Sequence, residues 1–319
     1  MNFMLNHLNN IEIPRRRFDM IPPDSIPGVE MYLLSPEQNF KYKNNDMTDI
    51  IKNSSIQEDL GKYDFMAYIR KPVIAVWTDT HECEMKFANK EEMDRFYSAK
   101  GVLYSDIVAA FSLGTWMVKD SSVYSDSYYW CNTDIEYTSK VHRSIQQTNA
   151  VGTMTVTSFT RQEIMDALQY MMKIYGILFS EMKNNDQPVM NYSQETVILN
   201  IEAAINSNGN NHYRALLLLQ LARKTGFLAE KINWYCAILE CLFGIKRDHK
   251  RNISEMTADY IGDTQAEKDQ IISDMRDAYK VRSEFVHGDV ISIFGQNKQL
   301  AELSVTIDDY VRRAFHKAL

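Results

Sequence analysis

The spacing of hydrophobic positions changes character about halfway along the chain. Residues 1–157 contain short runs rich in β-branched and aromatic side chains, the pattern of half-buried strands. These runs predict strands at 65–70, 73–80, 82–87, 127–138 and 152–159, and a short helix at 90–97. We therefore expect a mixed, β-rich N-terminal domain over residues 1–157.

From Thr160 onward the apolar residues follow helical spacing. Thr160 and Glu163 have the T-x-x-E form of a capping box, and they precede a helix predicted to run to about residue 182. Further helices are expected at 194–205, 211–225, 227–243, 253–261, 265–287 and 297–317. Residues 158–319 are thus predicted to form an all-α helical bundle, which makes the whole chain an α+β protein.

One cation interrupts the apolar stripe of the 265–287 helix. The stripe contains Ile272, Met275, Tyr279 and Val286, and Arg282 has the same spacing. A guanidinium on a packing face needs a carboxylate, a phosphate or a partner subunit, because an unpaired buried charge is costly. We therefore expect Arg282 to be compensated.

The 227–243 helix offers the compensating carboxylate. Glu240 continues the row Ile232, Cys236 at i+4 spacing and is predicted to point inward. We predict that Glu240 contacts Arg282. The pair serves equally well as a structural ion pair or as a group that orients Arg282 in an active site.

His287 ends the same helix, five residues after Arg282. Gly288 is suited to the left-handed position that follows a helix. The helix dipole favours the charged form of a C-terminal histidine, and histidine is the commonest general acid–base. A lone histidine here is more often a simple cap, but Arg282 beside it makes a catalytic role a competing interpretation.

The amino-acid composition excludes several classes of function but does not identify one. The 319 residues and 45% hydrophobic content suit a soluble protein of two domains, and a net charge of −7 argues against nucleic-acid binding through the overall field. Neither the four cysteines nor the seven histidines have metal-ligand spacing, so we expect no metal and no cofactor. No apolar stretch reaches 18 residues and no signal-peptide order is present, so we expect a cytoplasmic protein without a membrane partner.

The segments Tyr235–Gly244 and Tyr279–Gly288 together resemble the HEPN superfamily, and within it the Apea-like group. That superfamily is marked by R-x4–6-H near the end of a helix, which Arg282 and His287 match with four intervening residues. The resemblance covers about residues 160–319. It implies a metal-independent endoribonuclease that acts as a homodimer or higher homo-oligomer, with one composite site at the interface.

In that implied site His287 is the general base or acid and Arg282 stabilises charge on the phosphate, and Glu240 and Ser283 are further candidate catalytic residues. Ser283 follows the arginine, where active members commonly have Asn, Asp or His. The implied setting is a bacterial anti-phage or toxin-like defence system, in which the N-terminal domain meets a phage-derived or protein trigger. The alternatives are a catalytically inactive dimerisation or interaction module, and a ligand-sensing regulator that uses the aromatic N-terminal domain.

A basic segment follows the Glu240 helix. Lys246, Arg247, Lys250 and Arg251 could guide an RNA backbone toward the site, or they could form an ordinary solvated loop. From Arg161 onward the chain has 19 Lys and Arg against 21 Asp and Glu, so most of the acidic excess lies in the first half. Any contact with RNA is therefore expected to be local.

Overall fold

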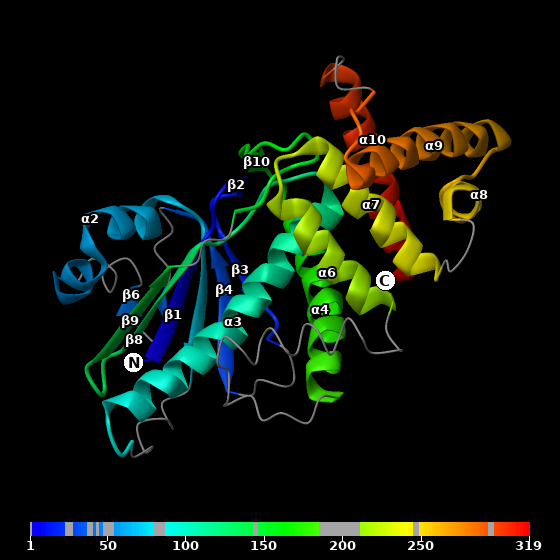
Figure 1. The fold of residues 1–319 in the computed structure, drawn as a ribbon. Coiled ribbons are helices and arrows are strands. Elements are labelled where there is room, and N and C mark those ends of the chain that lie inside the picture. The colour runs from blue at the N-terminus through cyan, green and yellow to red at the C-terminus, as the bar shows by residue number, and fades with distance from the viewer. Residues whose placement is uncertain are drawn as a thin grey trace.

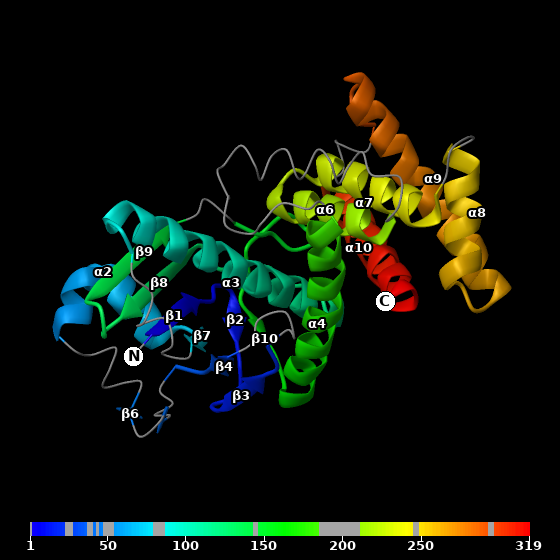
Figure 2. The ribbon, with the colours of Figure 1, turned by 90° about the horizontal axis from the view of Figure 1, so that it is seen from below.

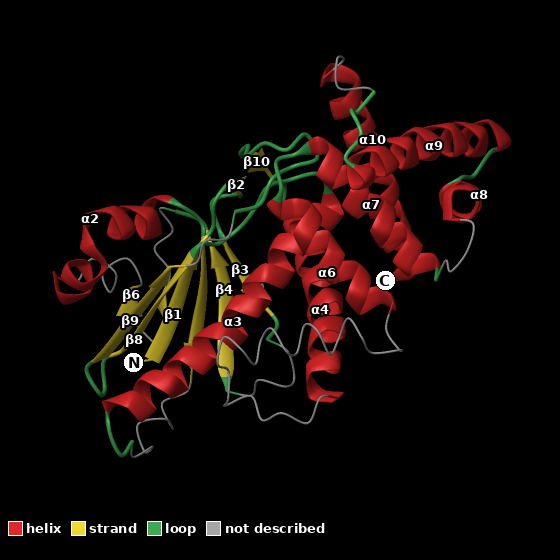
Figure 3. Ribbon diagram, viewed as in Figure 1, coloured by secondary structure: helices red, strands yellow, loops and turns green. Residues whose placement is uncertain are grey.

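The computed structural model describes residues 2–22, 28–36, 41–42, 45–46, 54–78, 87–142, 146–184, 211–244, 249–292 and 297–319. Strands gather in the N-terminal half and helices fill the C-terminal half (Figure 3). The α+β class predicted from the sequence is confirmed, whereas the HEPN-like identity of the bundle stays a prediction.

An antiparallel sheet forms the N-terminal half. Its six strands lie in the order β3 (Arg17–Met20), β4 (Val29–Leu34), β7 (Val73–Thr78), β1 (Asn2–His7), β8 (Ser127–Asn132) and β9 (Tyr137–His142). Two small ladders accompany it: β2 (Ile11–Glu12) pairs with β10 (Thr157–Ser158), and β5 (Lys41–Tyr42) pairs with β6 (Asn45–Asp46). The first strand, β1, is therefore central and lies between β7 and β8.

One helix covers each face of this sheet. Alternate residues of β1 point to opposite sides, so Phe3 and Leu5 join the core under α2 (Ser54–Arg70), while Met4 joins the core under α3 (Lys90–Val118). Figures 1 and 2 show α3 running from the sheet into the helical half. It is the element that carries the core from one half into the other.

The C-terminal half contains α4 (Arg161–Asn184), α6 (Asn211–Lys224), α7 (Leu228–Phe243), α8 (His249–Ile261), α9 (Gln265–His287) and α10 (Asn297–Ala318). These helices confirm every helix predicted here within the described residues; the one predicted at 194–205 lies outside them. The capping box is also confirmed. The Glu163 backbone N–H donates to Thr160 Oγ1 at 3.3 Å, and the Thr160 N–H donates to the Glu163 carboxylate at 2.7 Å.

Two predictions in the N-terminal half were wrong, and the helix predicted at 90–97 was confirmed but is longer than expected. Residues 65–70 are the end of α2, not a strand; Gly61 (φ 74°) kinks this helix and hides its period. The short helix at 90–97 is only the start of α3, whose later residues are nearly all buried and show no polar face. Of residues 152–159 only 157–158 are a strand, whereas 127–138 divides between β8 and β9 and 82–86 lies outside the described residues.

A single hydrophobic core crosses the predicted domain boundary. Side chains of β1, α3, α4, α7 and α10 belong to one buried cluster, including Met4, Phe111, Ile164, Leu239 and Phe315. The domain boundary at residues 157/158 stays a prediction, made from the change in hydrophobic spacing along the chain. In the folded chain the two halves share their interior.

α3 is long and apolar enough to cross a membrane, by length and composition, but 72% of its most apolar window is buried inside the protein. A buried apolar helix is what the core of a soluble protein requires. This arrangement is compatible with a soluble protein, and the cytoplasmic location stays a prediction.

Gly114→Ala is expected to destabilise the protein by about 1–3 kcal/mol. A Cβ at Gly114 would lie 2.3 Å from the Ala167 carbonyl oxygen, so α3 and α4 would have to move apart. Gly176→Ala on α4 is the matched control, because a Cβ there meets nothing within 4 Å. It should gain up to about 1 kcal/mol from helix propensity. Urea unfolding measures the free energy of unfolding of both variants. If Gly114→Ala gained as much stability as Gly176→Ala, the tight crossing of α3 and α4 would be contradicted.

Candidate functional site

The predicted contact between α7 and α9 is present. Arg282 Nη2 lies 3.3 Å from Glu240 Oε2, close enough for an ion pair and a hydrogen bond. The side chains are 26% and 14% exposed, so the pair lies at the edge of the bundle and not in its centre. A guanidinium at such an edge is both held in place and accessible.

Tyr279 is a second partner of this guanidinium. Arg282 Nη1 donates to the Tyr279 hydroxyl at 2.7 Å, and the guanidinium carbon lies 4.9 Å from the ring centre. Burial raises the pKa of Tyr279, with the Arg282 charge opposing that shift. The sequence placed Tyr279 on the apolar stripe but gave no sign of its polar role.

The apolar stripe of α9 differs by one position from the predicted one. The buried residues are Ile271, Met275, Ala278 and Val281. Val286, predicted to continue the stripe, is 58% exposed. The rotation arises because a helix advances 100° per residue, so a short list of apolar positions fixes its buried face only to about one residue.

His287 is the last residue of α9 and is exposed, as is Ser283. Gly288 adopts the expected left-handed cap (φ 73°), and its N–H donates to the carbonyls of Glu284 and Phe285. Within the described residues no hydrogen bond or ion pair joins Arg282 to His287. The two groups therefore share one helix end as separate side chains.

The basic segment cannot be placed against this site. Lys246 and Arg247 lie outside the described residues. Lys250 and Arg251 belong to the first turn of α8 by their backbone. Their proposed contact with RNA stays a prediction.

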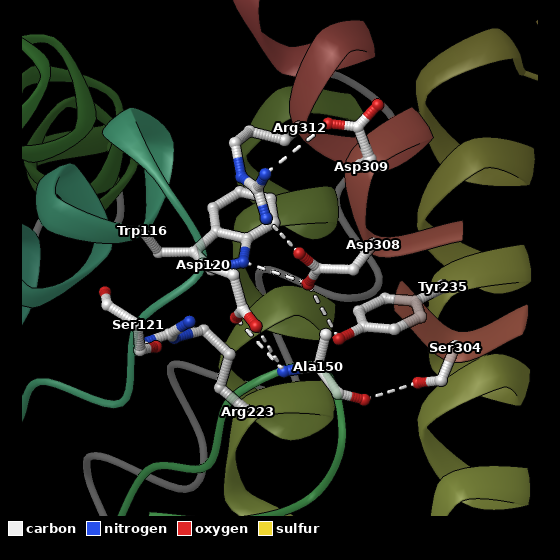
Figure 4. Close-up of polar contacts among 10 residues, drawn as sticks. All are labelled: Trp116, Asp120, Ser121, Ala150, Arg223, Tyr235, Ser304, Asp308, Asp309 and Arg312. Atoms are coloured by element: carbon white, nitrogen blue, oxygen red, sulfur yellow. Dashed lines mark hydrogen bonds and ion pairs between the residues drawn. The ribbon is translucent and has the colours of Figure 1, made fainter. Parts of the chain in front are cut away.

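A buried polar network, which the sequence did not predict, lies where the halves meet (Figure 4). Asp308 of α10 is 1% exposed and accepts from Trp116 Nε1 at 2.9 Å and from the Tyr235 hydroxyl at 2.8 Å. Arg312, one turn further on, forms an ion pair with Asp308 and lies over the Trp116 ring. These contacts tie α10 to α3 and α7.

Arg223 extends the network to the chain between the halves. Its side chain is almost fully buried, and it donates through Nε and Nη2 to Gln147 Oε1 at 3.0 and 2.8 Å and to the Ser121 carbonyl at 2.8 Å. Burial lowers its pKa to about 10. Nearby, both oxygens of Asp120 accept from the Ala150 N–H at 3.0 Å, and Ser304 donates to the Ala150 carbonyl at 2.6 Å. Gln147 borders a small pocket, but Asp308 and Arg223 are almost fully buried, so we interpret the network as structural.

Lys231 gives this network a measurable pH dependence. It is fully buried, donates to the Ala222 carbonyl at 2.7 Å, and its pKa falls from 10.5 to about 8, first through burial and then through the Arg223 charge. Below about pH 8 Lys231 is charged in both the folded and the unfolded states. Burying this charge then destabilises the folded state. Between about pH 8 and pH 10.5 the unfolded chain binds the extra proton, so this cost disappears and stability rises with pH.

We therefore expect the free energy of unfolding of wild type relative to Lys231→Met to increase between about pH 8 and pH 10.5. Urea melts of both proteins across this range measure it, and the subtraction removes the titration of the tyrosines. A pH-independent difference between the two proteins would show that Lys231 keeps its ordinary pKa, and so its charge, in the folded state.

The sheet carries a second constellation that the sequence did not reveal. His7 Nδ1 lies 3.1 Å from the Ser127 hydroxyl, and His7 Nε2 lies 3.1 Å from Asp126 Oδ1. This is the carboxylate–histidine–hydroxyl order of a nucleophilic triad. However, Ser127 is 3% exposed and the Tyr68 ring packs edge-on against His7. Because His7 and Ser127 are both almost fully buried, we interpret the trio as satisfying buried polar groups. Only the strand pairing of β1 with β8 brings these residues together.

The remaining chemistry is sparse. Among the described residues no group of three or more His, Cys, Asp or Glu could hold a metal ion. Cys131, Cys236 and Cys241 are free thiols, and burial raises the pKa of Cys236 to about 12, which makes it a poor nucleophile. The end of α9 is therefore the best candidate site in the described chain.

Comparison with known proteins adds no assignment: no family model, no curated protein and no solved structure matches this chain.

Proposed function

We propose that the chain is a metal-independent endoribonuclease in which Arg282 binds the scissile phosphate and His287 transfers protons. The site lies at the end of α9, and two protomers complete it. The resemblance to HEPN proteins suggested this function. The side-chain arrangement described above supports it.

The observation that carries the proposal is the way Arg282 is held. Glu240 and Tyr279 each take one donor of the guanidinium and fix its plane. Its Nε is buried and without a partner among the described residues, so the second hydrogens of Nη1 and Nη2 are the donors left for a ligand. A fixed guanidinium with donors to spare matches phosphate oxygens, which accept paired hydrogen bonds from the fork.

His287 supplies the proton transfer. It takes the proton of the RNA 2′-hydroxyl as that oxygen attacks the neighbouring phosphorus. The bond from phosphorus to the 5′-oxygen breaks, and that oxygen receives a proton from a second general acid, which the partner's copy of this histidine supplies. The products are a 2′,3′-cyclic phosphate and a 5′-hydroxyl, and no metal or cofactor takes part.

Exposed apolar residues surround His287 and fit a dimer. Phe285, Val286 and Val290 are 40%, 58% and 88% exposed. Apolar side chains next to exposed polar groups are typical of a surface that another protein covers. A second copy of the chain on this end of α9 would bring two His287 side chains into one site.

The test is incubation of the full-length protein with RNA in excess EDTA. We expect cleavage that EDTA does not abolish and fragments that end in a 2′,3′-cyclic phosphate, identified by mass spectrometry. Fragments with a 3′-hydroxyl, or cleavage that requires a divalent metal, would refute the mechanism. The assay includes lysate from phage-infected cells, because the proposed defence role requires a trigger that meets the N-terminal half.

The exposed side chains of Phe285, Val286 and Val290 also fit a second function, that of a non-enzymatic dimerisation module. In that case the protein is a stable dimer, measured by light scattering, and cleaves no RNA under any of these conditions. Arg282 and His287 would then contribute only to the interface.

A further inference from the structure

An uncharged pocket lies between α3 and the central strands, at the beginning of β8. Its volume is about 40 Å³, and it is open to solvent on one side. Every described residue that lines it is neutral, and the polar ones used below are Asn6, Ser105, Ser112 and Gln147. This space holds about three waters, so it accepts the amide edge of a small ring whose far side stays in solvent, but not a nucleotide.

The most informative lining residue is Asn6 on β1. It is 2% exposed, and its Nδ2 is buried without a hydrogen-bond partner among the described residues. Buried amide nitrogens in folded proteins are almost always satisfied, so one that is not requires an explanation. A ligand, or water, in the pocket that Asn6 lines would supply the partner.

Gln147 supplies a second amide whose orientation is fixed. Arg223 donates twice to Gln147 Oε1, which turns the other side of the planar amide, Nε2, away from Arg223. The described residues offer Nε2 no hydrogen bond, and Gln147 lines the pocket. The pocket therefore has an oriented donor in addition to the Asn6 amide.

The serine hydroxyls complete the pattern as acceptors. Ser105 donates to the Gly101 carbonyl at 2.6 Å, and Ser112 donates to the Val108 carbonyl at 3.1 Å. Each hydroxyl hydrogen is used in a bond to the helix backbone, so the hydroxyl oxygen can only accept a hydrogen bond from a ligand. The pocket thus offers donors and acceptors but no charge.

We propose that this pocket binds a small uncharged ligand with an amide edge, an N–H beside a C=O, of the size of one lactam ring. The Asn6 amide pairs with that edge through one donor and one acceptor, as planar amides do. A phosphate or carboxylate does not fit, because no cation among the described residues lines the pocket to compensate it. The site belongs to the sheet half of the molecule and is independent of the proposed cleavage chemistry.

Uracil is the probe, tested on the full-length protein by ligand-observed saturation-transfer NMR and by titration calorimetry. We expect saturable binding to wild type, no binding of 1,3-dimethyluracil, and loss of uracil binding in Asn6→Leu. Asn6→Asp, which removes the donor at constant size, should weaken binding at least tenfold. Asn89→Asp at the start of α3 carries the same change outside the pocket and should bind as wild type does.

Absence of uracil binding to a folded wild-type protein at millimolar concentration would overturn the proposal and leave the pocket to water. Binding that survives in Asn6→Leu would place the ligand elsewhere and equally overturn it. Near-ultraviolet circular dichroism of each variant shows whether the aromatic core around the pocket is retained. If Asn6→Leu fails to fold, Asn6→Asp and the dimethylated probe still decide the outcome.

Discussion

Asp308→Ala is expected to lower the free energy of unfolding by about 3–5 kcal/mol, the largest stability effect that we predict for one side chain. Asp308 is 1% exposed and serves Trp116, Tyr235 and Arg312 at once. Removing its carboxylate leaves two buried donors without an acceptor and leaves Arg312 only its longer contact with the exposed Asp309. Urea unfolding followed by tryptophan fluorescence measures the loss.

Asp309→Ala is the matched control for this prediction. Asp309 also contacts Arg312, at 3.5 Å, but its side chain is 50% exposed. Exposed pairs contribute about 0–1 kcal/mol, so the control should change stability little. Equal effects of the two variants would show that Asp308 does not hold the network together.

His287→Ala is expected to reduce the rate of RNA cleavage by about 10²–10⁴-fold, the range for loss of a general acid–base. Arg282→Ala should lose about 10²–10³-fold, because a positioned donor to the developing charge disappears. Arg282→Lys keeps the charge but not the planar fork, and we expect it to recover little. Single-turnover cleavage of a labelled RNA measures all three.

Arg276→Ala is the control on the same helix, because Arg276 is exposed and lies outside the proposed site. It should cleave as wild type does. Glu240→Gln should weaken RNA binding and cleavage less than Arg282→Ala, since it loosens the guanidinium without removing it. Cleavage that persists in both His287→Ala and Arg282→Ala would assign the chemistry to other residues and refute the proposed site.

The helical half was predictable from sequence because its signals are local. The Thr160–Glu163 capping box, the glycine after His287 and the i+4 row that ends at Glu240 each act within a few residues. Even the contact between α7 and α9 followed from charge, since an arginine on a packing face requires a carboxylate. Tyr279 was missed because a tyrosine on a stripe reads first as an apolar residue.

The sheet half was harder because its signals are long-range. Strand β1 lies between β7 and β8, more than sixty residues away in the chain, and no short window encodes that pairing. For the same reason the His7–Ser127 contact and the pocket around Asn6 could not be predicted. Asp308 and Arg223 were likewise missed, because the groups that satisfy them come from elements far away in sequence.

The buried network around Arg223 has a consequence for evolution and for protein engineering. Sensor regions of multi-part proteins can be exchanged when only a linker joins them to the effector. Here Gln147 and the Ser121 carbonyl, both before the helical half, satisfy an arginine of that half. A chimera that takes its first 157 residues from a protein without a glutamine at position 147 would leave Arg223 buried without this hydrogen-bond acceptor. Substitutions in the first half must therefore retain Gln147, whose side chain satisfies Arg223, whereas any residue at position 121 supplies the carbonyl.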